Sequence, residues 1–245
     1  MTNLAIIGGT GLDTLGLLEV HKREVVSTPY GSPSGAIARG SLFRREVFFL
    51  PRHGYSHSYA PHKINYRANL WALRELGAEN ILSIAAVGGI SEEMPPAKLV
   101  VPDQIIDYTW GRTSTYYENE NDQVVHIDFT RPYCEDLRQK LLRSATAANV
   151  NVVASGTYGA TQGPRLETAA EILRMERDGC DIVGMTGMPE AALARETDLC
   201  YATCAVVANW AAGKGQGEIT MEAIEKDLKL GLSDVSEVLE KFVSD

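Results

Sequence analysis

The sequence predicts an α/β fold in which helices flank a central mixed, mostly parallel sheet. Short apolar runs of strand length alternate with longer segments of helical periodicity along the whole chain, the pattern of a parallel sheet with helical connections. Glycine and hydroxyl residues directly follow several of the apolar runs. No internal repeat, low-complexity tract or Pro/Ser-rich linker divides the 245 residues, so we expect a single domain over residues 1–245.

Apolar runs of strand length predict seven buried strands, at residues 4–7, 46–50, 80–87, 99–106, 152–160, 181–184 and 201–208. The first run stops at Gly8-Gly9 and the second at Pro51, residue types that interrupt regular structure. The third run begins soon after Gly77, which is the expected stop signal of the helix before it.

Helical periodicity predicts five helices, at residues 64–76, from Pro132 onward, and at 168–178, 191–196 and 220–242. Pro132 suits the first position of a helix, and Glu135 and Asp136 place negative charge in a first turn, where the helix dipole favours it. Thr220 is the expected N-cap of the last helix. The polar, turn-rich stretch 112–123 is expected to form a surface loop.

The overall charge argues against two classes of partner. The net charge is −9 and the pI is near 5.1, whereas nucleic acids and anionic membrane surfaces attract basic faces. The N-terminal residues lack the pattern of a secretion signal, and no apolar run approaches the roughly 18 residues of a membrane span. We therefore expect a cytoplasmic protein that binds neither nucleic acid nor membrane.

The cysteines indicate a reducing compartment. None of Cys134, Cys180, Cys200 and Cys204 forms a C-x-x-C pair, and the last two lie inside the apolar stretch LCYATCAVVA. We expect all four to be buried thiols with a structural role.

Three predicted strand ends carry groups that bind anions. Thr10 follows a glycine turn, Arg52 and His53 follow the second strand, and Thr186 follows the strand at 181–184. Ligands of open α/β sheets bind at the carboxyl ends of strands, where main-chain amides, hydroxyls and a guanidinium can hold a phosphate. Each turn taken alone could be purely structural. Their convergence predicts a phosphate or carboxylate site.

Two other interpretations of these turns fail. A dinucleotide-binding turn would need a glycine where Thr14 stands, and an acidic residue after a second strand about 20 residues further on, which is missing. The histidines His53, His57 and His62 lack the cysteines or the helical H-E-x-x-H spacing of a zinc site. We expect no metal and no cofactor.

Seven motifs together resemble the purine nucleoside phosphorylase/methylthioadenosine phosphorylase family over nearly the whole chain. They are IIGGTG at 6–11, PRHG at 51–54, NYRANLWAL at 65–73, AAVGGI at 85–90, GTYGATQGPRLET at 156–168, GMTGMPEAALARE at 184–196 and CYATCAVVAN at 200–209. The resemblance implies a nucleoside phosphorylase fold and a homotrimer. It also implies reversible phosphorolysis of a nucleoside, with inorganic phosphate as a co-substrate.

The resemblance also implies which residues contact phosphate and sugar. The implied phosphate ligands are Thr10, Arg52, His53, Ala85, Ala86 and Thr186. Ala85 stands where the family has a threonine, so Ala85 and Ala86 can offer only main-chain groups. Met185 falls where the family packs a methionine beneath the ribose. His126 falls where a histidine reaches the 5′ end of the substrate from the adjacent subunit.

Two positions predict the purine. Family members specific for inosine and guanosine carry glutamate and asparagine at the positions of Glu167 and Asn209, whereas adenine-specific methylthio enzymes carry serine and aspartate there, with a second aspartate at Ala211. Glu167 can accept the N1–H that only a 6-oxopurine has. Asn209 can contact N7 and O6, and it is the expected catalytic residue that stabilises the departing base. Alternatively, Glu167 serves only as a carboxylate at a helix N-terminus.

The start of the last helix predicts the 5′ substituent. Enzymes that prefer a 5′-hydroxyl place a histidine here, whereas Met221 aligns with a small apolar residue of the methylthio branch. An apolar wall suits a methylthio group and would leave a hydroxyl unpaired. The alternative is that Met221 simply faces the core.

These features predict methylthioinosine and phosphate as the substrates. The alternatives are methylthioadenosine, or a broader range of 6-oxopurine nucleosides such as inosine and guanosine. From other classes, a nucleosidase would use water, and a nucleoside-binding protein would release no base. Release of hypoxanthine with and without phosphate separates these three classes.

Overall fold

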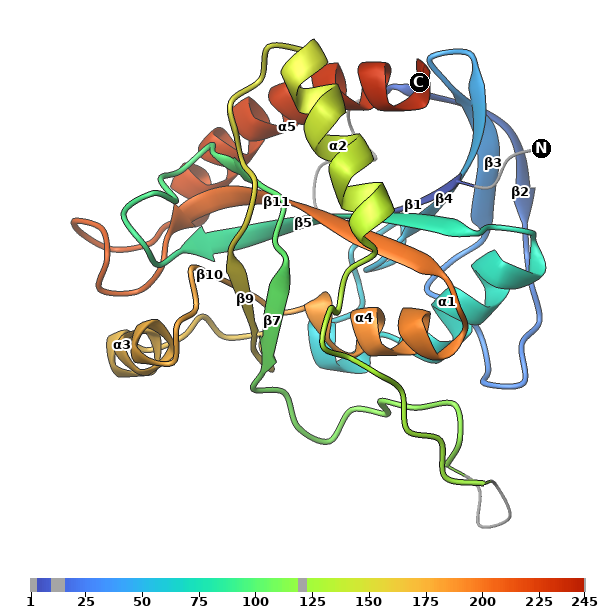
Figure 1. Cartoon of the computed structure of the whole chain (residues 1–245), viewed down its shortest axis with the longest axis horizontal. Helices are drawn as coiled ribbons and strands as arrows, with labels where there is room; N and C mark the ends of the chain where they lie inside the picture. The colour runs from blue at the N-terminus through green and yellow to red at the C-terminus, as the bar shows by residue number, and fades with distance from the viewer. Residues whose placement is uncertain (1–3, 10–15, 119–122, 245) are drawn as a thin grey trace.

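The computed structural model describes residues 4–9, 16–118 and 123–244. These residues form an eleven-stranded sheet with helices on both faces (Figure 1). The strands are β1 (Leu4–Gly8), β2 (Leu18–Glu24), β3 (Ile37–Leu42), β4 (Arg45–Pro51), β5 (Asn80–Gly89), β6 (Leu99–Val100), β7 (Gln104–Asp107), β8 (Val152–Val153), β9 (Thr157–Ala160), β10 (Ile182–Gly184) and β11 (Cys200–Trp210). The helices are the 3-10 turn η2 (Pro61–Lys63), α1 (Tyr66–Glu75), α2 (Glu135–Ala147), α3 (Ala169–Arg177), α4 (Gly187–Glu196) and α5 (Met221–Ser244).

The sheet is mixed and mostly parallel, as predicted. Its main path runs β2-β3-β4-β1-β5-β10-β9-β7, and β11 pairs with β5 and leads on to β6 and β8. The central strands β4, β1, β5 and β11 are parallel to one another. Antiparallel pairing occurs at β2–β3–β4, between β5 and β10, and between β6 and β11. Parallel neighbours place several strand carboxyl ends at one edge, the edge at which α/β proteins bind ligands.

The sheet branches at β5. Residues 80–84 of this strand pair with β1, whereas Gly88 and Gly89 pair with β10. Residues 85–87 lie between these two partners, and Ala86 is exposed within an otherwise buried stretch of the strand. The parting of β1 and β10 therefore brings β5 main chain to the surface at Ala86.

Successive residues of the central strands pack into two cores. Ala5 and Ile7 of β1 belong to the cluster that includes α1 and α4, and Ile6 belongs to the cluster that includes α2 and α5. This alternation is the period of two of an extended chain, and it explains why strands covered on both faces are apolar throughout. Figure 1 shows α2 and α5 on one side of the sheet and α1 and α4 on the other. Helix α3 packs into a smaller third cluster through Ile172 and Met175.

Two predicted strands are each divided in two. The run 99–106 forms β6 and β7, because Pro102 has no N–H for a ladder and because β6 pairs with β8 and β11 whereas β7 pairs with β9. The run 152–160 forms β8 and β9 for the matching reason, since β9 pairs with β7 and β10.

Other differences lie at helix starts and at the sheet edge. Helix α2 begins at Glu135 and not at Pro132, because the main chain at Cys134 is still hydrogen-bonded to β11, its N–H donating to Tyr201 O at 2.8 Å. Helix α4 spans Gly187–Glu196 and so begins four residues earlier than expected, but it is kinked at Met188, whose main chain is not helical. Strands β2 and β3 were not predicted, since the edge strand β2 reads LEVHKRE and has no apolar run. The expected loop lacks regular structure over residues 112–118.

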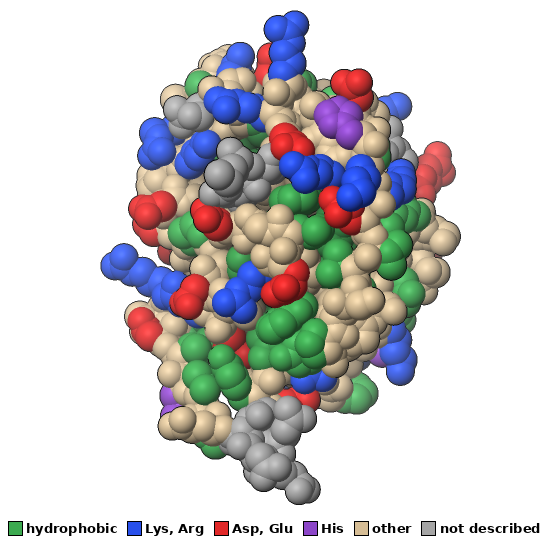
Figure 2. Space-filling model, turned by 90° about the vertical axis from the view of Figure 1, so that its right-hand side faces the viewer, with side chains coloured by type: hydrophobic (Ala, Val, Ile, Leu, Met, Phe, Trp, Pro, Cys, Tyr) green, Lys and Arg blue, Asp and Glu red, His purple; other side chains and the backbone are tan. Residues whose placement is uncertain are grey.

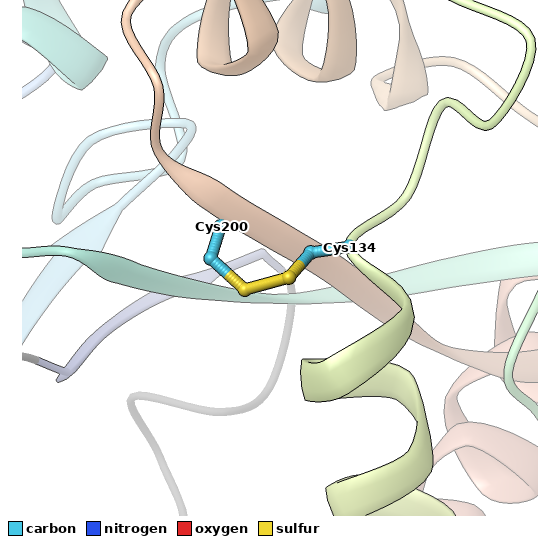
Figure 3. The surroundings of a disulfide bond; sticks show 2 residues. All are labelled: Cys134 and Cys200. Atoms are coloured by element: carbon cyan, nitrogen blue, oxygen red, sulfur yellow. A yellow bond between two sulfur atoms is a disulfide. The ribbon is translucent and has the colours of Figure 1, made fainter.

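A disulfide joins Cys134, the N-cap of α2, to Cys200 at the start of β11 (Figure 3). The expectation of four thiols is therefore wrong. The two cysteines are 66 residues apart, and only the contact between α2 and β11 brings them together. Cys180 and Cys204 are free and buried, and burial raises the pKa of the Cys204 thiol to about 12. The cytoplasmic location, which partly depended on reduced cysteines, stays a prediction.

Among the described helices, none is long and apolar enough to span a membrane. On the face shown in Figure 2, basic and acidic side chains are interspersed around smaller apolar areas.

Candidate active site

One cleft of about 520 Å³ lies where the chain leaves β4, β10 and β11 and where β5 branches. Ten predicted site residues line it: Arg52, His53, Ala85, Ala86, Glu167, Met185, Thr186, Asn209, Ala211 and Met221. Thr10 lies outside the described residues, although its neighbour Gly9 lines the cleft. His126 is exposed and does not line this cleft. The structure thus brings together residues from five separate motifs.

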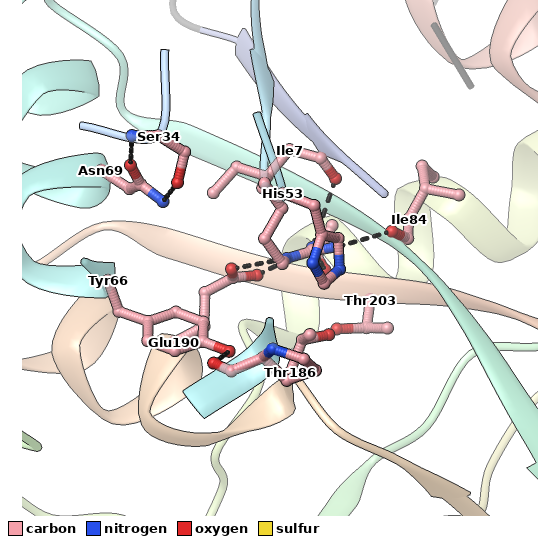
Figure 4. Close-up of polar contacts among 12 residues, drawn as sticks. Ile7, Ser34, His53, Tyr66, Asn69, Ile84, Thr186, Glu190 and Thr203 are labelled. Atoms are coloured by element: carbon pink, nitrogen blue, oxygen red, sulfur yellow. Dashed lines mark hydrogen bonds and ion pairs between the residues drawn. The ribbon is translucent and has the colours of Figure 1, made fainter. Parts of the chain in front are cut away.

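Arg52, at the end of β4, is only 1% exposed. Its Nε and Nη2 donate to the two carboxylate oxygens of Glu190 at 2.8 and 3.0 Å (Figure 4). Nη2 also donates to Ser83 Oγ at 2.7 Å, and Nη1 donates to Ile84 O at 3.1 Å. The planar fork that we expected to hold phosphate is therefore occupied by Glu190. The second N–H of Nη1 remains, and this nitrogen lies 3.3 Å from where a Cβ on Gly9 would be.

Glu190 is a buried partner that the sequence analysis missed. It lies on α4, is 1% exposed, and accepts a third hydrogen bond on Oε1 from Tyr201 Oη at 2.9 Å. Burial opposes the charged form of Arg52, but the Glu190 carboxylate raises the Arg52 pKa above its ordinary value, so the two form an ion pair. The available signal was an acidic residue inside the apolar stretch MPEAALA.

His53 is held as a neutral imidazole. Its Nδ1 lies 2.8 Å from Tyr59 O, and because a carbonyl oxygen can only accept, Nδ1 carries the proton. Burial lowers the His53 pKa to about 4, which keeps Nε2 unprotonated at neutral pH. Nε2 can therefore accept a hydrogen bond from a protonated phosphate oxygen.

Thr186 is the N-cap of α4, and its side chain makes no capping hydrogen bond. Its main-chain N–H donates to Tyr158 Oη at 3.4 Å, so the Thr186 hydroxyl is the group that can donate to an anion. Next to it, Met185 packs against Gly163, where any side chain would overlap the Met185 thioether. Gly184 is equally constrained, because a Cβ there would lie 2.1 Å from Tyr158 Oη.

Glu167 lies at the other end of the cleft, on the loop before α3. Thr161 Oγ1 donates to Glu167 Oε1 at 2.6 Å. The N-terminus of α3 is capped instead by Thr168 and Glu171, which form a reciprocal capping box. The capping hydrogen bonds of α3 therefore come from Thr168 and Glu171 and not from Glu167.

Asn209 owes its direction to a β-bulge. The β5–β11 register pairs Val207 with Val87 and then Asn209 with Gly88, so Ala208 is the extra residue. Bulges re-aim side chains near binding sites. Asn209 Nδ2 donates to Trp210 O at 2.7 Å, which leaves Oδ1 and one further N–H for a ligand.

Met221 begins α5 and is 65% exposed, so the alternative in which it faces the core is wrong. Two further residues of this wall, Ile219 and Ile224, were missed by the sequence analysis. Their polar neighbours in GEITMEAIEK hid them, since only the fold shows that they face the cleft. Within the described residues, no group of three or more His, Cys, Asp or Glu side chains could hold a metal ion.

Comparisons with known proteins show the family of the chain. The model of the phosphorylase superfamily matches residues 3–244. A probable S-methyl-5′-thioinosine phosphorylase of Xanthomonas campestris pv. campestris is 53% identical over 237 residues, which cover 96% of this chain and 95% of that protein. The 6-oxopurine nucleoside phosphorylase of Pyrococcus furiosus is 44% identical over 98% of this chain and 91% of that protein. The solved structure of methylthioadenosine phosphorylase from Schistosoma mansoni in complex with adenine is 33% identical, with a TM-score of 0.95 over 100% of this chain and 91% of that one.

Proposed function

Because the chain belongs to the phosphorylase superfamily, we propose that it catalyses the phosphorolysis of S-methyl-5′-thioinosine to hypoxanthine and 5-methylthioribose 1-phosphate. The observation that carries this proposal is that Glu167 and Asn209 share one cleft with Arg52 and Thr186. The pair Glu167 and Asn209 suits a 6-oxopurine, and the other two residues suit phosphate. Relatives named for methylthioinosine and for 6-oxopurine nucleosides support the same substrate class.

At the phosphate end of the cleft, the positive charge of Arg52 is already paired with Glu190, so hydrogen-bond donors would hold the phosphate. The remaining Nη1 donor of Arg52, the Thr186 hydroxyl and main-chain groups at residues 85–86 would hold the anion, and His53 Nε2 would accept its proton. Cleavage of a glycosidic bond passes through an oxocarbenium-like sugar. A phosphate fixed beside that carbon is both the nucleophile and the compensating charge.

The base end would stabilise the charge that develops on the departing purine. Asn209 can donate to N7 with its free N–H, while Glu167 accepts from N1–H. Adenine has an unprotonated N1, which would face the carboxylate with no hydrogen between them. Such a mismatch in a polar site costs far more than the loss of a methyl contact.

The sugar would lie between these ends. Met185 lines the cleft, packs against Gly163 and would lie beneath the ribose. The wall of Ile219, Met221 and Ile224 would cover the 5′-methylthio group. A 5′-hydroxyl at this wall would lose its hydrogen bonds to water, so the methylthio nucleoside is favoured.

The proposal includes a homotrimer in which His126 completes the site of a neighbouring subunit. His126 lies in a stretch without regular secondary structure, and its neighbours Val124 and Val125 are 73% and 42% exposed. A shallow groove of about 410 Å³ that Val124, Val125 and Phe129 help to line supports a subunit contact here. We expect light scattering to give a trimer and His126→Ala to weaken nucleoside binding. A fully active monomer would contradict this part.

The test is a set of initial rates on methylthioinosine, methylthioadenosine, inosine and adenosine, each with and without phosphate. We expect methylthioinosine to be cleaved fastest, and only with phosphate. Equal rates on methylthioinosine and inosine would favour a broad 6-oxopurine enzyme, and a preference for methylthioadenosine would favour that alternative. Undiminished base release without phosphate would indicate hydrolysis, and no release at all a binding protein.

A further inference from the structure

Thr161 contacts the carboxylate of Glu167, the group that we propose to recognise the base. It follows β9, is 7% exposed, and its Oγ1 lies 2.6 Å from Glu167 Oε1 and 3.3 Å from Gly184 O. A hydroxyl has one proton to donate, and the shorter distance to a charged acceptor assigns that proton to Glu167. Within residues 4–9, 16–118 and 123–244, Oε2 of Glu167 accepts no hydrogen bond.

The main chain of Thr161 is held from two sides. Its N–H donates to Gly184 O at 2.8 Å, and its carbonyl accepts from Arg112 Nη2 at 3.1 Å. The same guanidinium donates to the carbonyls of Gln162 at 2.8 Å and Met185 at 2.8 Å. Arg112 therefore ties the loop that carries Glu167 to the loop that carries Met185 and fixes the main chain from which the Thr161 hydroxyl projects.

We propose that Thr161 is a specificity-determining residue that orients the Glu167 carboxylate, so that its remaining oxygen accepts N1–H of the base. This inference rests on the proposed function. The terminal torsion of a glutamate is broad when nothing holds it, so an unrestrained carboxylate would lose its direction. The short hydrogen bond from Thr161 Oγ1 to Glu167 Oε1 fixes that torsion.

The direction of the Glu167 carboxylate decides which purine is favoured. Thr161 holds Oε1, so Oε2 is the oxygen left to accept the N1–H of a 6-oxopurine, whereas adenine has no hydrogen at N1. Removing the Thr161 hydroxyl should therefore lower the rate on methylthioinosine more than the rate on methylthioadenosine.

The experiment compares Thr161→Val with Thr161→Ser, which keeps the hydroxyl. The control is Thr197→Val, since Thr197 is 9% exposed and its hydroxyl donates to the Leu193 and Ala194 carbonyls of α4, away from the cleft. The readouts are the ratio of kcat/KM for methylthioinosine to that for methylthioadenosine, and the ratio of the inhibition constant of adenine to that of hypoxanthine. We expect Thr161→Val to lower both ratios about tenfold to 100-fold, the range for a hydrogen bond to a charged group, while the other two variants keep them.

The outcomes separate this inference from the proposed function. If the unmodified enzyme does not prefer methylthioinosine, the proposed function fails first. If it does, and folded Thr161→Val keeps both ratios or loses activity equally on both substrates, Thr161 has only a structural role and the inference is overturned. Should Thr161→Val fail to fold in a thermal melt, Thr161→Ala against Thr161→Ser provides the same comparison.

Discussion

The phosphate end and the base end of the cleft are built in different ways. Arg52 and Glu190 are both 1% exposed. They form a buried ion pair although they are 138 residues apart in the sequence. At the base end, Glu167 is half-buried on a loop and Met221 is 65% exposed at the first residue of a helix. The groups expected to hold the co-substrate are thus part of the core, and those expected to choose the nucleoside lie at its margin.

This difference indicates which changes the molecule tolerates. A buried ion pair leaves an uncompensated charge when one partner is removed, so the phosphate end cannot vary without a loss of stability. Side chains on loops can change with little effect on stability. A family built this way can keep phosphorolysis while its members differ in purine and 5′ substituent, as the names of the similar proteins indicate.

The largest expected effect is at the base end. The double variant Glu167→Ser with Asn209→Asp should shift preference toward methylthioadenosine, because aspartate can accept from the exocyclic amine and serine removes the unmatched carboxylate. We expect the unmodified enzyme to favour methylthioinosine by roughly 10⁴, since a site that hydrogen-bonds a substrate N–H rejects the analogue without it. The kcat/KM ratio measures this, and thermal melting should show a change of less than about 1 kcal/mol in stability. Equal cleavage of both nucleosides by the unmodified enzyme would contradict our account of the base end.

The next effect is at the phosphate end. Arg52→Met should lower the free energy of unfolding by about 3–5 kcal/mol, because Glu190 is left charged and buried. It should also raise the apparent KM for phosphate far more than that for the nucleoside. The control is Arg39→Met, since the ion pair of Arg39 with Glu46 is exposed, at 44% and 39%, and its loss should cost far less stability.

A double variant separates stability from phosphate binding. Arg52→Met with Glu190→Leu removes both charges, so most of the lost stability should return in urea unfolding while phosphate use stays impaired. If Arg52→Met alone costs no more than the Arg39 control, the phosphate end is not part of the core in the sense proposed here.

Sequence periodicity predicted the central strands because they are buried on both faces and therefore apolar throughout. It missed β2, whose residues LEVHKRE are exposed at an edge, and it joined β6 to β7 because a change of pairing partner leaves no trace in an apolar run. The Cys134–Cys200 disulfide was also missed, because the two cysteines meet only where α2 contacts β11, and a sequence pattern does not show that contact.

The residues that line the cleft were largely predicted from the sequence, whereas the residues that hold them in place were not. Strand ends and the family resemblance located ten residues that line one cleft. The partners Glu190 and Thr161 carry no motif of their own, and their roles follow from single contacts to Arg52 and Glu167. The predicted role of Arg52 was wrong in one respect. We expected its guanidinium to face phosphate, whereas the structure shows that Nε and Nη2 donate to Glu190.

The smallest expected effect uses His53, which lies between the core and the surface. Its pKa is about 4 in the folded protein, because of burial, and about 6.5 in an unfolded chain. Between these values the unfolded chain binds a proton at residue 53 that the folded protein does not bind. Its contribution to stability is thus complete above pH 6.5 and is lost as the pH falls toward 4.

We expect His53→Gln to remove this part of the pH dependence. The free energy of unfolding of the unmodified protein, minus that of the variant, should fall by about 1–3 kcal/mol between pH 7 and pH 4, the partial exposure of the ring keeping the effect below that of a fully buried group. Urea unfolding at several pH values measures the difference, and His21→Gln, on the exposed strand β2, is the control. Parallel curves for the unmodified protein and His53→Gln would mean that His53 can take up a proton in the fold. It would then meet phosphate as a cation, and the phosphate end would depend on net charge after all.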